Sequence, residues 1–306
     1  MASERWAGPL ALCGAVAFWG FVPTATRYLA ESFTPGQILL ARFSLGGLVI
    51  LLLFALWRPP MPSRQNLPKA AALGVFAALS FNVPVAYGIN IIEGGTAALL
   101  IGTQLIFITL LAGIFLKEHI PRRMIVGLLM ALFGSSIIAL SGGGGFSLEG
   151  RYLLGCGLVL LASFLWSSYS VVAKPHLGPD LPAPSLVMIG TLLCLPLVVP
   201  LGADGFVDKM AGLPPVGWFA VVLLAAGASV AAPVLWNVGL LLGQASRSSL
   251  FLTLVPIFGV VTSVTLLGEP LRGSMLIGGT LIVTGILLAT VPPDVIRRRV
   301  PAPTGC

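Results

Sequence analysis

The sequence is short of charge: only 9% of its 306 residues are Asp, Glu, Lys or Arg, while 57% are hydrophobic. A soluble domain carries roughly a quarter of its residues as charged ones, so such a domain is excluded for most of the chain. The mean hydropathy is +1.02. The charges fall between apolar stretches of roughly 18–25 residues, the length that crosses a bilayer as a helix. The chain is therefore predicted to be an integral membrane protein.

Residues that build metal sites, disulfide frameworks and catalytic centres are scarce as well. The two histidines, His119 and His176, lie far apart in the sequence, so we expect no metal site and no cofactor. Three of the four cysteines fall inside apolar runs, which is not the pattern of a disulfide framework. No nucleophile with a base and no paired carboxylates fall inside the apolar stretches. A membrane-embedded enzyme is therefore only a remote alternative.

Ten apolar spans are present, and a glycine-rich segment at 141–150 separates five of them from the other five. The sequence thus predicts an all-α membrane protein with three parts: a first five-helix repeat (1–145), a second five-helix repeat (146–293) and a short basic tail (294–306). The predicted spans are 7–29, 36–57, 68–92, 95–116, 122–141, 151–173, 184–203, 214–242, 246–267 and 272–291.

The two halves repeat one another. Pairs at matching positions, with offsets of 147, 149 and 151 residues in chain order, are Trp19 and Trp166, Tyr87 and Trp236, and Glu118 and Glu269. Offsets that grow along the chain are what small loop insertions produce after a duplication. Because each half holds an odd number of spans, the second half must cross the membrane in the opposite sense. An inverted repeat of hydrophobic halves is a common construction of secondary transporters.

The net charge of +7 comes from basic residues that flank the spans. This pattern indicates contact with anionic lipid headgroups, and we expect no nucleic-acid partner. Twelve of the basic residues fall on the side of the two termini, and only four fall on the opposite side, namely Arg27, Arg151, Lys209 and Arg272. The positive-inside rule therefore places both termini in the cytoplasm.

Several stretches carry a family resemblance. They are FWG at 18–20, ARFSLGGLVILLL at 41–53, PVAYGINIIEGGTAALL at 84–100 and SLFLTLVPIFGVVTSVTLLGEPL at 249–271. Through them the whole chain resembles the drug/metabolite transporter superfamily. Within it, the chain looks like the ten-helix EamA-type exporters, above all the bacterial aromatic and broad-range amino-acid exporters.

The resemblance implies an inner-membrane exporter of small amphipathic metabolites, most of all amino acids including aromatic ones, that works by alternating access. Spans 1, 3, 4, 6, 8 and 9 would line a central cavity, and spans 5 and 10 would support it from outside. A carrier of drugs, quaternary cations or nucleotide sugars is the alternative within the superfamily. No oligomer is required.

A polar solute that crosses a bilayer needs a wetted cavity near the midplane, lined by groups that would be costly against lipid. The candidates are Trp19, Asn82, Tyr87, Asn90, Gln104, Trp166, Tyr169, Trp236 and Asn237. Trp19 and Trp166 lie in mid-span, which argues against an interfacial aromatic belt. For the amides the alternative is hydrogen bonding between packed helices.

Arg42 joins the cavity candidates because it lies about seven residues inside the second span, where a charge is costly. Two interpretations stay open at this point. The guanidinium contacts a substrate carboxylate or acts at a gate, or it snorkels or binds backbone carbonyls. No basic residue occupies the corresponding position of the seventh span.

Prolines interrupt several spans and each removes a backbone hydrogen bond. Pro84 and Pro233 occupy matched positions in the two halves and are predicted hinges, with a static kink as the alternative. Pro256 lies thirteen residues before Glu269, where the family usually has a proline, whereas Leu105 stands at the equivalent position of the first half. We therefore expect a hinge at Pro256 and a softer one, or none, in the fourth span.

Glu118 and Glu269 each end a span and have an arginine within one helical turn, Arg122 and Arg272. Spacings of three and four residues allow ion pairs on one helix face. We expect both glutamates to pair locally and to have a structural role. No other acidic residue lies deep in a span, so the sequence identifies no proton pathway.

Overall fold

The computed structural model describes residues 2–117, 122–140, 150–242, 248, 251–252 and 254–290. These residues are helical almost throughout, with one isolated bridge between Gly178 and Leu181. In the first half the helices are α1 (Ala2–Gly20), α2 (Val22–Leu29), α3 (Pro35–Trp57), α4 (Leu67–Ile89), α5 (Gly94–Ile101), α6 (Gln104–Phe115) and α7 (Arg122–Leu140).

The second half repeats this order of helices. They are α8 (Gly150–Ala173), the short η2 (Lys174–His176), α9 (Ala183–Gly202), α10 (Phe206–Ala211), α11 (Pro215–Val222), the π-helix η3 (Leu223–Ala231), α12 (Ala232–Leu242), α14 (Leu254–Leu267) and α15 (Gly273–Thr290). Seven helical stretches are long and apolar enough to cross a membrane, and shorter apolar helices lie within the three remaining predicted spans, 122–141, 246–267 and 272–291. The predicted all-α membrane architecture is confirmed.

Local sequence sets where these helices begin and end. At the start of α3 the Thr34 side chain accepts a hydrogen bond from the Gln37 backbone N–H, and the Gln37 side chain accepts one from the Thr34 N–H. This capping box, followed by Pro35, satisfies amide groups that the first turn leaves free. Arg58 ends the helix in a left-handed conformation with φ of 43°. Such a residue stops the helix where the chain leaves the membrane.

The fourth span is interrupted near the position for which a softer hinge, or none, is predicted. Its helix breaks between α5 and α6 at Gly102 and Thr103, although no proline is present. The Thr103 hydroxyl donates to the Leu100 carbonyl at 2.7 Å, a local bond that competes with the helix ladder. Glycine beside it has low helix propensity. Pro256 of the second half lies in the first turn of α14, and a Cβ on Gly102 would lie 3.1 Å from its Cγ.

Contacts at one end of the bundle join the loops that follow spans 1, 7 and 9. Lys209 Nζ, from α10 in the loop after α9, donates to the Ser32 carbonyl at 2.7 Å. Arg27 Nε, at the end of α2, lies 3.9 Å from Glu269 Oε1, just after α14. Loops separated by an even number of spans therefore share one face of the protein.

At the opposite end, the loop after span 2 and the start of α4 contact the loop after span 6 and the start of α9. Ser185 Oγ donates to the Pro60 carbonyl at 2.5 Å, and Lys69 Nζ lies 2.9 Å from His176 Nδ1. The loop after span 6 is the repeat equivalent of the loop after span 1, yet the two lie at opposite ends. The halves are thus inverted, as the odd number of spans predicts.

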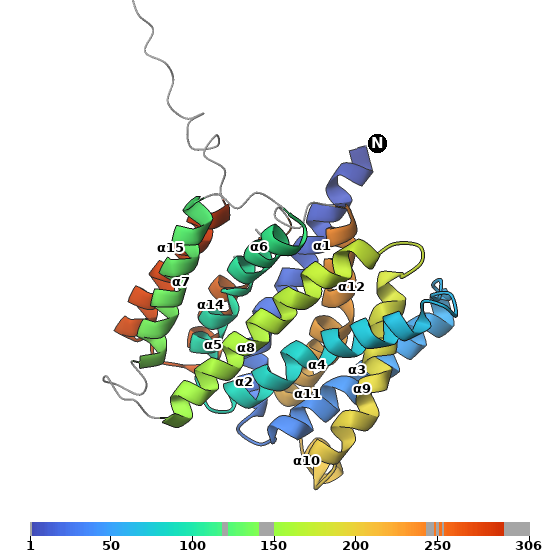
Figure 1. Ribbon diagram of the computed structural model, residues 1–306. Coiled ribbons are helices and arrows are strands. Elements are labelled where there is room, and N and C mark those ends of the chain that lie inside the picture. Colours follow the sequence, from blue (N-terminus) through green and yellow to red (C-terminus); the bar gives the residue numbers. More distant parts are fainter. Residues whose placement is uncertain are drawn as a thin grey trace, which may run out of the picture.

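The helices of both halves interleave around the centre of the molecule (Figure 1). Helix α4 packs on α8 and α9, and α1 packs on α12 and α14. Helices α7 and α15 pack mainly on each other and form one edge of the bundle (Figure 1). This is the outer supporting position that the family resemblance implies for spans 5 and 10.

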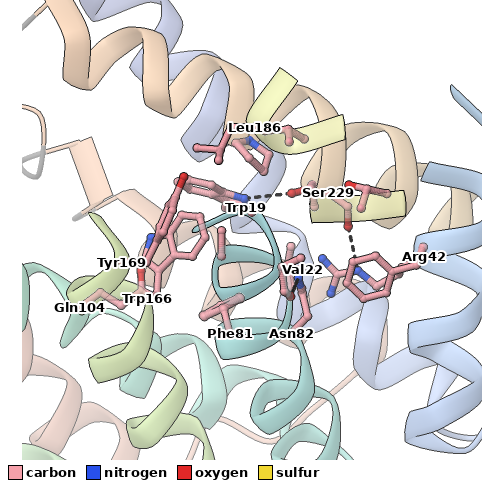
Figure 2. A pocket seen from close by; sticks show the side chains of 18 of the residues that line it. Trp19, Val22, Arg42, Phe81, Asn82, Gln104, Trp166, Tyr169, Leu186 and Ser229 are labelled. Atoms are coloured by element: carbon pink, nitrogen blue, oxygen red, sulfur yellow. Dashed lines mark hydrogen bonds between the residues drawn. The ribbon is translucent and has the colours of Figure 1, made fainter. Parts of the chain in front are cut away.

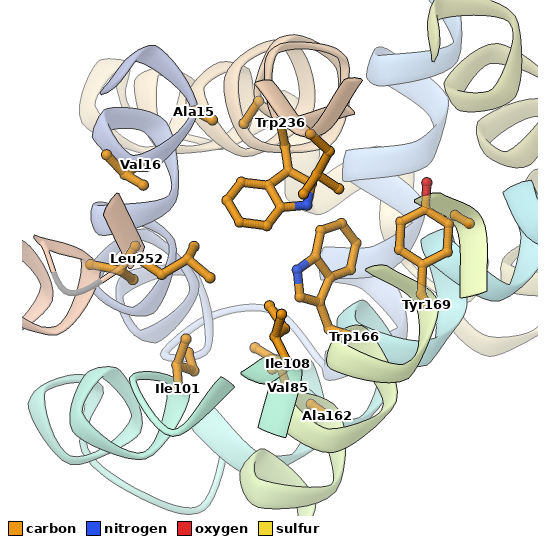
Figure 3. Close-up of a cluster of buried hydrophobic side chains, with 14 of the residues drawn as sticks. Ala15, Val16, Val85, Ile101, Ile108, Ala162, Trp166, Tyr169, Trp236 and Leu252 are labelled. Atoms are coloured by element: carbon orange, nitrogen blue, oxygen red, sulfur yellow. The ribbon is translucent and has the colours of Figure 1, made fainter. Parts of the chain in front are cut away.

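The central core combines aromatic and aliphatic side chains from both halves (Figure 3). Trp236 and Tyr169 are almost fully buried, with 0% and 1% of their surface exposed. Close backbone contact tightens the bundle beside this core. A Cβ on Gly190 of α9 would lie 2.3 Å from the Gly74 carbonyl oxygen of α4, so both positions require glycine.

Candidate functional site

A small pocket lies in the middle of the bundle, with a cavity volume of about 60 Å³. It lies at mid-span depth, since Trp19, Gln104 and Ser229 are near the centres of spans 7–29, 94–115 and 215–242. Its principal polar and aromatic lining residues are Trp19, Arg42, Phe43, Phe81, Asn82, Gln104, Trp166, Tyr169, Thr191 and Ser229 (Figure 2). Both halves of the chain contribute.

One wall of the pocket is aromatic. The Trp19 and Trp166 rings meet edge to face with centroids 5.4 Å apart, and Trp166 also packs on Phe81 at 5.9 Å and Tyr169 at 5.2 Å. Trp19 Nε1 donates to the Ala228 carbonyl at 3.2 Å, which fixes the plane of that indole. Helices α1, α4 and α8 thus present one continuous set of rings, with apolar faces and polar edges.

The opposite part of the pocket holds a buried cation. Arg42 of α3 is 3% exposed, and its Nε donates to Ser229 Oγ at 3.1 Å. Ser229 lies in the π-helix η3 and donates in turn to the Leu224 carbonyl five residues earlier, at 2.8 Å. Pro233 follows four residues after Ser229 and has no N–H to bond there, so the widened turn absorbs the missing bond. Arg42 is held inside the protein and does not snorkel to the interface.

Two amides complete the polar lining. Asn82 Nδ2 donates to the Ala78 carbonyl of the preceding turn at 2.7 Å, and Asn82 Oδ1 is buried without a partner. Gln104 is 5% exposed and lies beside Trp166 at the aromatic end (Figure 2). Polar groups therefore lie at both ends of the pocket, with aromatic rings between them.

Six of the predicted cavity residues meet at this pocket, and two more support it from behind. The six are Trp19, Arg42, Asn82, Gln104, Trp166 and Tyr169. Asn237 Nδ2 donates to the Tyr169 hydroxyl at 3.2 Å, and Trp236 packs on Trp19 at 5.6 Å. Neither Asn237 nor Trp236 lines the space itself.

Tyr87 and Asn90 are the exceptions: neither lines this pocket, and their cavity role stays a prediction. Tyr87 is 39% exposed and Asn90 is only half-buried, and neither lines the pocket. The pocket face of α4 runs through Gly74, Ala78 and Asn82. Five residues of α-helix turn through about 140°, so Tyr87 points away from the face that carries Asn82.

The sequence reasoning missed lining residues from spans 2 and 7 and from the π-helix. Phe43 follows Arg42, and Leu186 and Thr191 come from α9, a span without aromatic or charged residues to draw attention. Ser229 carried one available signal, because it stands four residues before Pro233. The pocket is thus lined by spans 2 and 7 in addition to the six that the resemblance implies.

Glu269 does not pair with Arg272, which corrects the expected local ion pair. Its carboxylate accepts hydrogen bonds from the backbone N–H groups of Gly94 and Gly95, both at 2.9 Å, at the start of α5. Arg272 Nη2 lies 2.6 Å from Glu93 Oε1 instead. A helix N-terminus attracts a carboxylate through its free N–H groups and its dipole, and this outweighs the neighbouring cation. Glu118 lies outside the described residues.

Within the described part of the chain, no group of three or more His, Cys, Asp or Glu side chains comes together. The pocket residues described above offer binding surfaces: rings, amides and one guanidinium. A mid-membrane pocket built from facing helices in an inverted repeat defines a transporter of small molecules.

Comparison with known proteins specifies the family. The EamA-like transporter family matches the chain twice, over residues 6–140 and 153–291. The chain belongs to this family. The two matches fall in the two halves that the internal repeat defines.

Curated relatives cover almost the whole chain. An uncharacterized transporter of Archaeoglobus fulgidus is 27% identical over 97% of this chain and 100% of its own length. A protein named as a probable terminal-alkyne amino-acid exporter in Streptantibioticus cattleyicolor is 27% identical over 91% of each chain. A probable amino-acid metabolite efflux pump of Escherichia coli is 26% identical over 93% of this chain and 95% of its own.

A crystal structure of another protein has the same fold. The two structures superpose with a TM-score of 0.65 at 20% sequence identity. The superposition covers 97% of this chain and 99% of the other chain. The family and the names of the relatives point to transport and not to an enzyme.

Proposed function

We propose that the protein exports small amphipathic metabolites, with α-amino acids including aromatic ones as the leading class. The observation that carries this proposal is the pocket itself, which the Trp19 and Trp166 rings share with a buried cation, Arg42. An amino acid offers an apolar side chain for the rings and a carboxylate for the guanidinium. Transport proceeds by alternating access, because the pocket lies at mid-span between two inverted halves.

The names of two relatives support the same substrate class. One is described as an amino-acid exporter and another as an amino-acid metabolite efflux pump, both at similar identity to this chain. The two names give different amino-acid substrates, so what these substrates have in common is the amino-acid backbone and not one side chain. We propose that this protein recognises the same backbone.

Drug or quaternary-cation transport fits the pocket less well. Aromatic cages attract quaternary ammonium groups, but here Arg42 shares the cavity and repels a cation. Among the described lining residues no carboxylate offsets that charge. A nucleotide sugar typically carries two phosphates, and the one guanidinium among those residues balances only part of their negative charge.

We also propose a bacterial inner-membrane location with both termini in the cytoplasm. The twelve-to-four distribution of basic residues supports this orientation. In this arrangement Pro84 inside α4, Pro233 after the π-helix and Pro256 at the start of α14 are hinge candidates. Pro84 and Pro233 each remove a backbone hydrogen bond beside or near the pocket, whereas Pro256 lies in the first turn of α14, where the N–H is free in any case.

Counterflow in proteoliposomes tests the proposal. Vesicles loaded with unlabelled phenylalanine or threonine should accumulate the same labelled amino acid at rates well above protein-free vesicles. Repeating the measurement with and without a pH gradient separates proton-coupled transport from facilitated diffusion. Absence of counterflow for every amino acid, with a quaternary cation transported instead, would replace the proposed substrate class by the alternative.

A further inference from the structure

Among the residues that the structure describes, Arg42 is a buried cation without an anionic partner. In the described part of the protein its one hydrogen bond is the Nε contact to Ser229, and it takes part in no ion pair. Arginine has five N–H donors, so four of them have no protein acceptor. A buried charge is costly unless it is paired, and snorkelling is excluded because only 3% of the residue is exposed.

The free donors of Arg42 face the pocket. Some polar atoms, such as Thr26 Oγ1 and Asn82 Oδ1, are fully buried and have no hydrogen-bond partner. The two terminal nitrogens of Arg42 are not among these atoms. Arg42 lines the cavity, and Figure 2 shows its guanidinium on the side of Val22 and Asn82. The anion that completes this site must therefore come from the cavity.

Asn82 supplies the complementary group. Its Oδ1 is buried and accepts no hydrogen bond, while its Nδ2 donates to the Ala78 carbonyl. The orientation of the amide follows from chemistry, because a backbone carbonyl only accepts and so binds the NH₂ end. A buried acceptor without a donor is costly. Asn82 therefore offers a place for an N–H donor from the ligand.

These two unsatisfied groups have opposite requirements and lie on the same pocket. We propose that Arg42, steadied by Ser229, binds the α-carboxylate of the substrate and that Asn82 Oδ1 accepts a hydrogen bond from its α-ammonium group. The side chain then extends towards Trp19 and Trp166. The inference rests on the proposed function and deepens it: the recognised unit is the zwitterionic backbone of an amino acid, and the rings accommodate a variable side chain.

Competition by analogues tests this subsite on the unaltered protein. Labelled phenylalanine counterflow is measured against unlabelled phenylalanine, phenylalaninamide, phenethylamine and 3-phenylpropionate. We expect phenylalaninamide and phenethylamine, which lack the carboxylate, to compete at least about 100-fold more weakly, because they leave Arg42 unpaired. We expect 3-phenylpropionate, which lacks only the ammonium, to compete about tenfold more weakly.

Two substitutions assign the roles. Asn82→Leu should make phenylalanine and 3-phenylpropionate equal competitors, because the acceptor for the ammonium is gone. Arg42→Gln should abolish the preference for phenylalanine over phenylalaninamide, and Arg42→Lys should restore part of it through its charge. Asn90→Leu and Arg64→Gln, outside the pocket, are matched controls and should leave the ranking unchanged.

The outcomes separate the two levels of the proposal. Equal competition by phenylalanine and phenylalaninamide overturns the carboxylate site, and equal competition by phenylalanine and 3-phenylpropionate overturns the ammonium site. In both cases amino-acid export itself stands. If phenylalanine and every other amino acid fail to be transported, the proposed function is wrong. Should an Arg42 variant fail to fold, the analogue series on the unaltered protein still decides.

Discussion

Trp166 is the residue at which the aromatic wall converges, since Trp19, Phe81 and Tyr169 all pack against it. Each aromatic pair contributes about 0.5–1.5 kcal/mol beyond its buried area. We expect Trp166→Ala to lower phenylalanine counterflow at least about tenfold, because a substrate ring loses its main stacking surface. Size-exclusion chromatography checks that the variant is folded. Trp218→Ala, at a ring that is 42% exposed on α11, is the control and should transport normally.

Glu269 acts at a helix end and not on the substrate. Its two oxygens hold the first N–H groups of α5, and Arg27 lies nearby. We expect Glu269→Gln to lower the free energy of unfolding by about 1.5–3 kcal/mol, because the amide keeps one acceptor oxygen, now uncharged, and places an NH₂ donor against the second N–H group. Thermal unfolding in detergent measures this loss. Glu31→Gln, at an exposed position on the same face, should leave the melting temperature unchanged.

Residue type alone predicted much of the pocket lining. It did not predict which face of each helix points into the pocket. Trp19, Trp166 and Gln104 are costly against lipid and do line the pocket. Tyr87 has the same chemistry but lies on another face of α4, and a sequence without its tertiary partners does not say which face points inward. The cap that Glu269 forms on α5 joins residues about 175 positions apart, a distance that no local pattern reveals.

The π-helix η3 is the element that brings Ser229 to Arg42. Pro233 prevents a regular α-helical bond to residue 229 and thereby favours the widened turn. We expect Pro233→Ala to let η3 relax towards an α-helix, which rotates Ser229 away from Arg42 and lowers transport several-fold. Stability should not fall, because alanine has the higher helix propensity.

Counterflow and thermal unfolding on the same preparation separate these two effects. Pro196→Ala provides the control, since Pro196 lies inside α9 but does not line the pocket. Equal transport by the Pro233 and unaltered proteins would mean that the wide turn has no part in binding.

The contact between α4 and α9 depends on two glycines beside the pocket. A Cβ on Gly190 would lie 2.3 Å from the Gly74 carbonyl oxygen, and backbone atoms cannot move aside cheaply. We expect Gly190→Ala to destabilise the protein by about 1–3 kcal/mol, measured as a lower melting temperature. At Gly157 of α8 a Cβ would meet nothing within 4 Å. Gly157→Ala should therefore be neutral or stabilise by up to about 1 kcal/mol.

At the scale of the molecule, hydropathy and the repeat predicted the architecture because the bilayer permits so few solutions. Within lipid a single apolar segment satisfies its own backbone only as a helix, so apolar length defines each span, and an odd number of spans inverts the second half. Breaks within spans were harder to foresee. Gly102 and Thr103 interrupt span 4 without a proline, and the close approach of Gly102 to Pro256 of α14 depends on how the halves pack.

Inversion makes a prediction about the two faces of the membrane. Glu31 and Gly178 are repeat equivalents, 147 residues apart. The loops that contain them lie at opposite ends of the bundle. Reporters fused after these two positions should therefore lie on opposite sides of the membrane. We expect alkaline phosphatase to be active when fused after Glu31 and inactive when fused after Gly178.

A green fluorescent protein reporter should give the reverse pattern at these two positions and should fluoresce when fused after Cys306, because the basic loops hold that side in the cytoplasm. Activity of both phosphatase fusions would show parallel halves and contradict the inverted repeat. The reverse pattern, with activity only after Gly178, would keep the inversion but turn the whole protein over. The exit side of the pocket, and hence the direction of export, depends on which of these patterns is found.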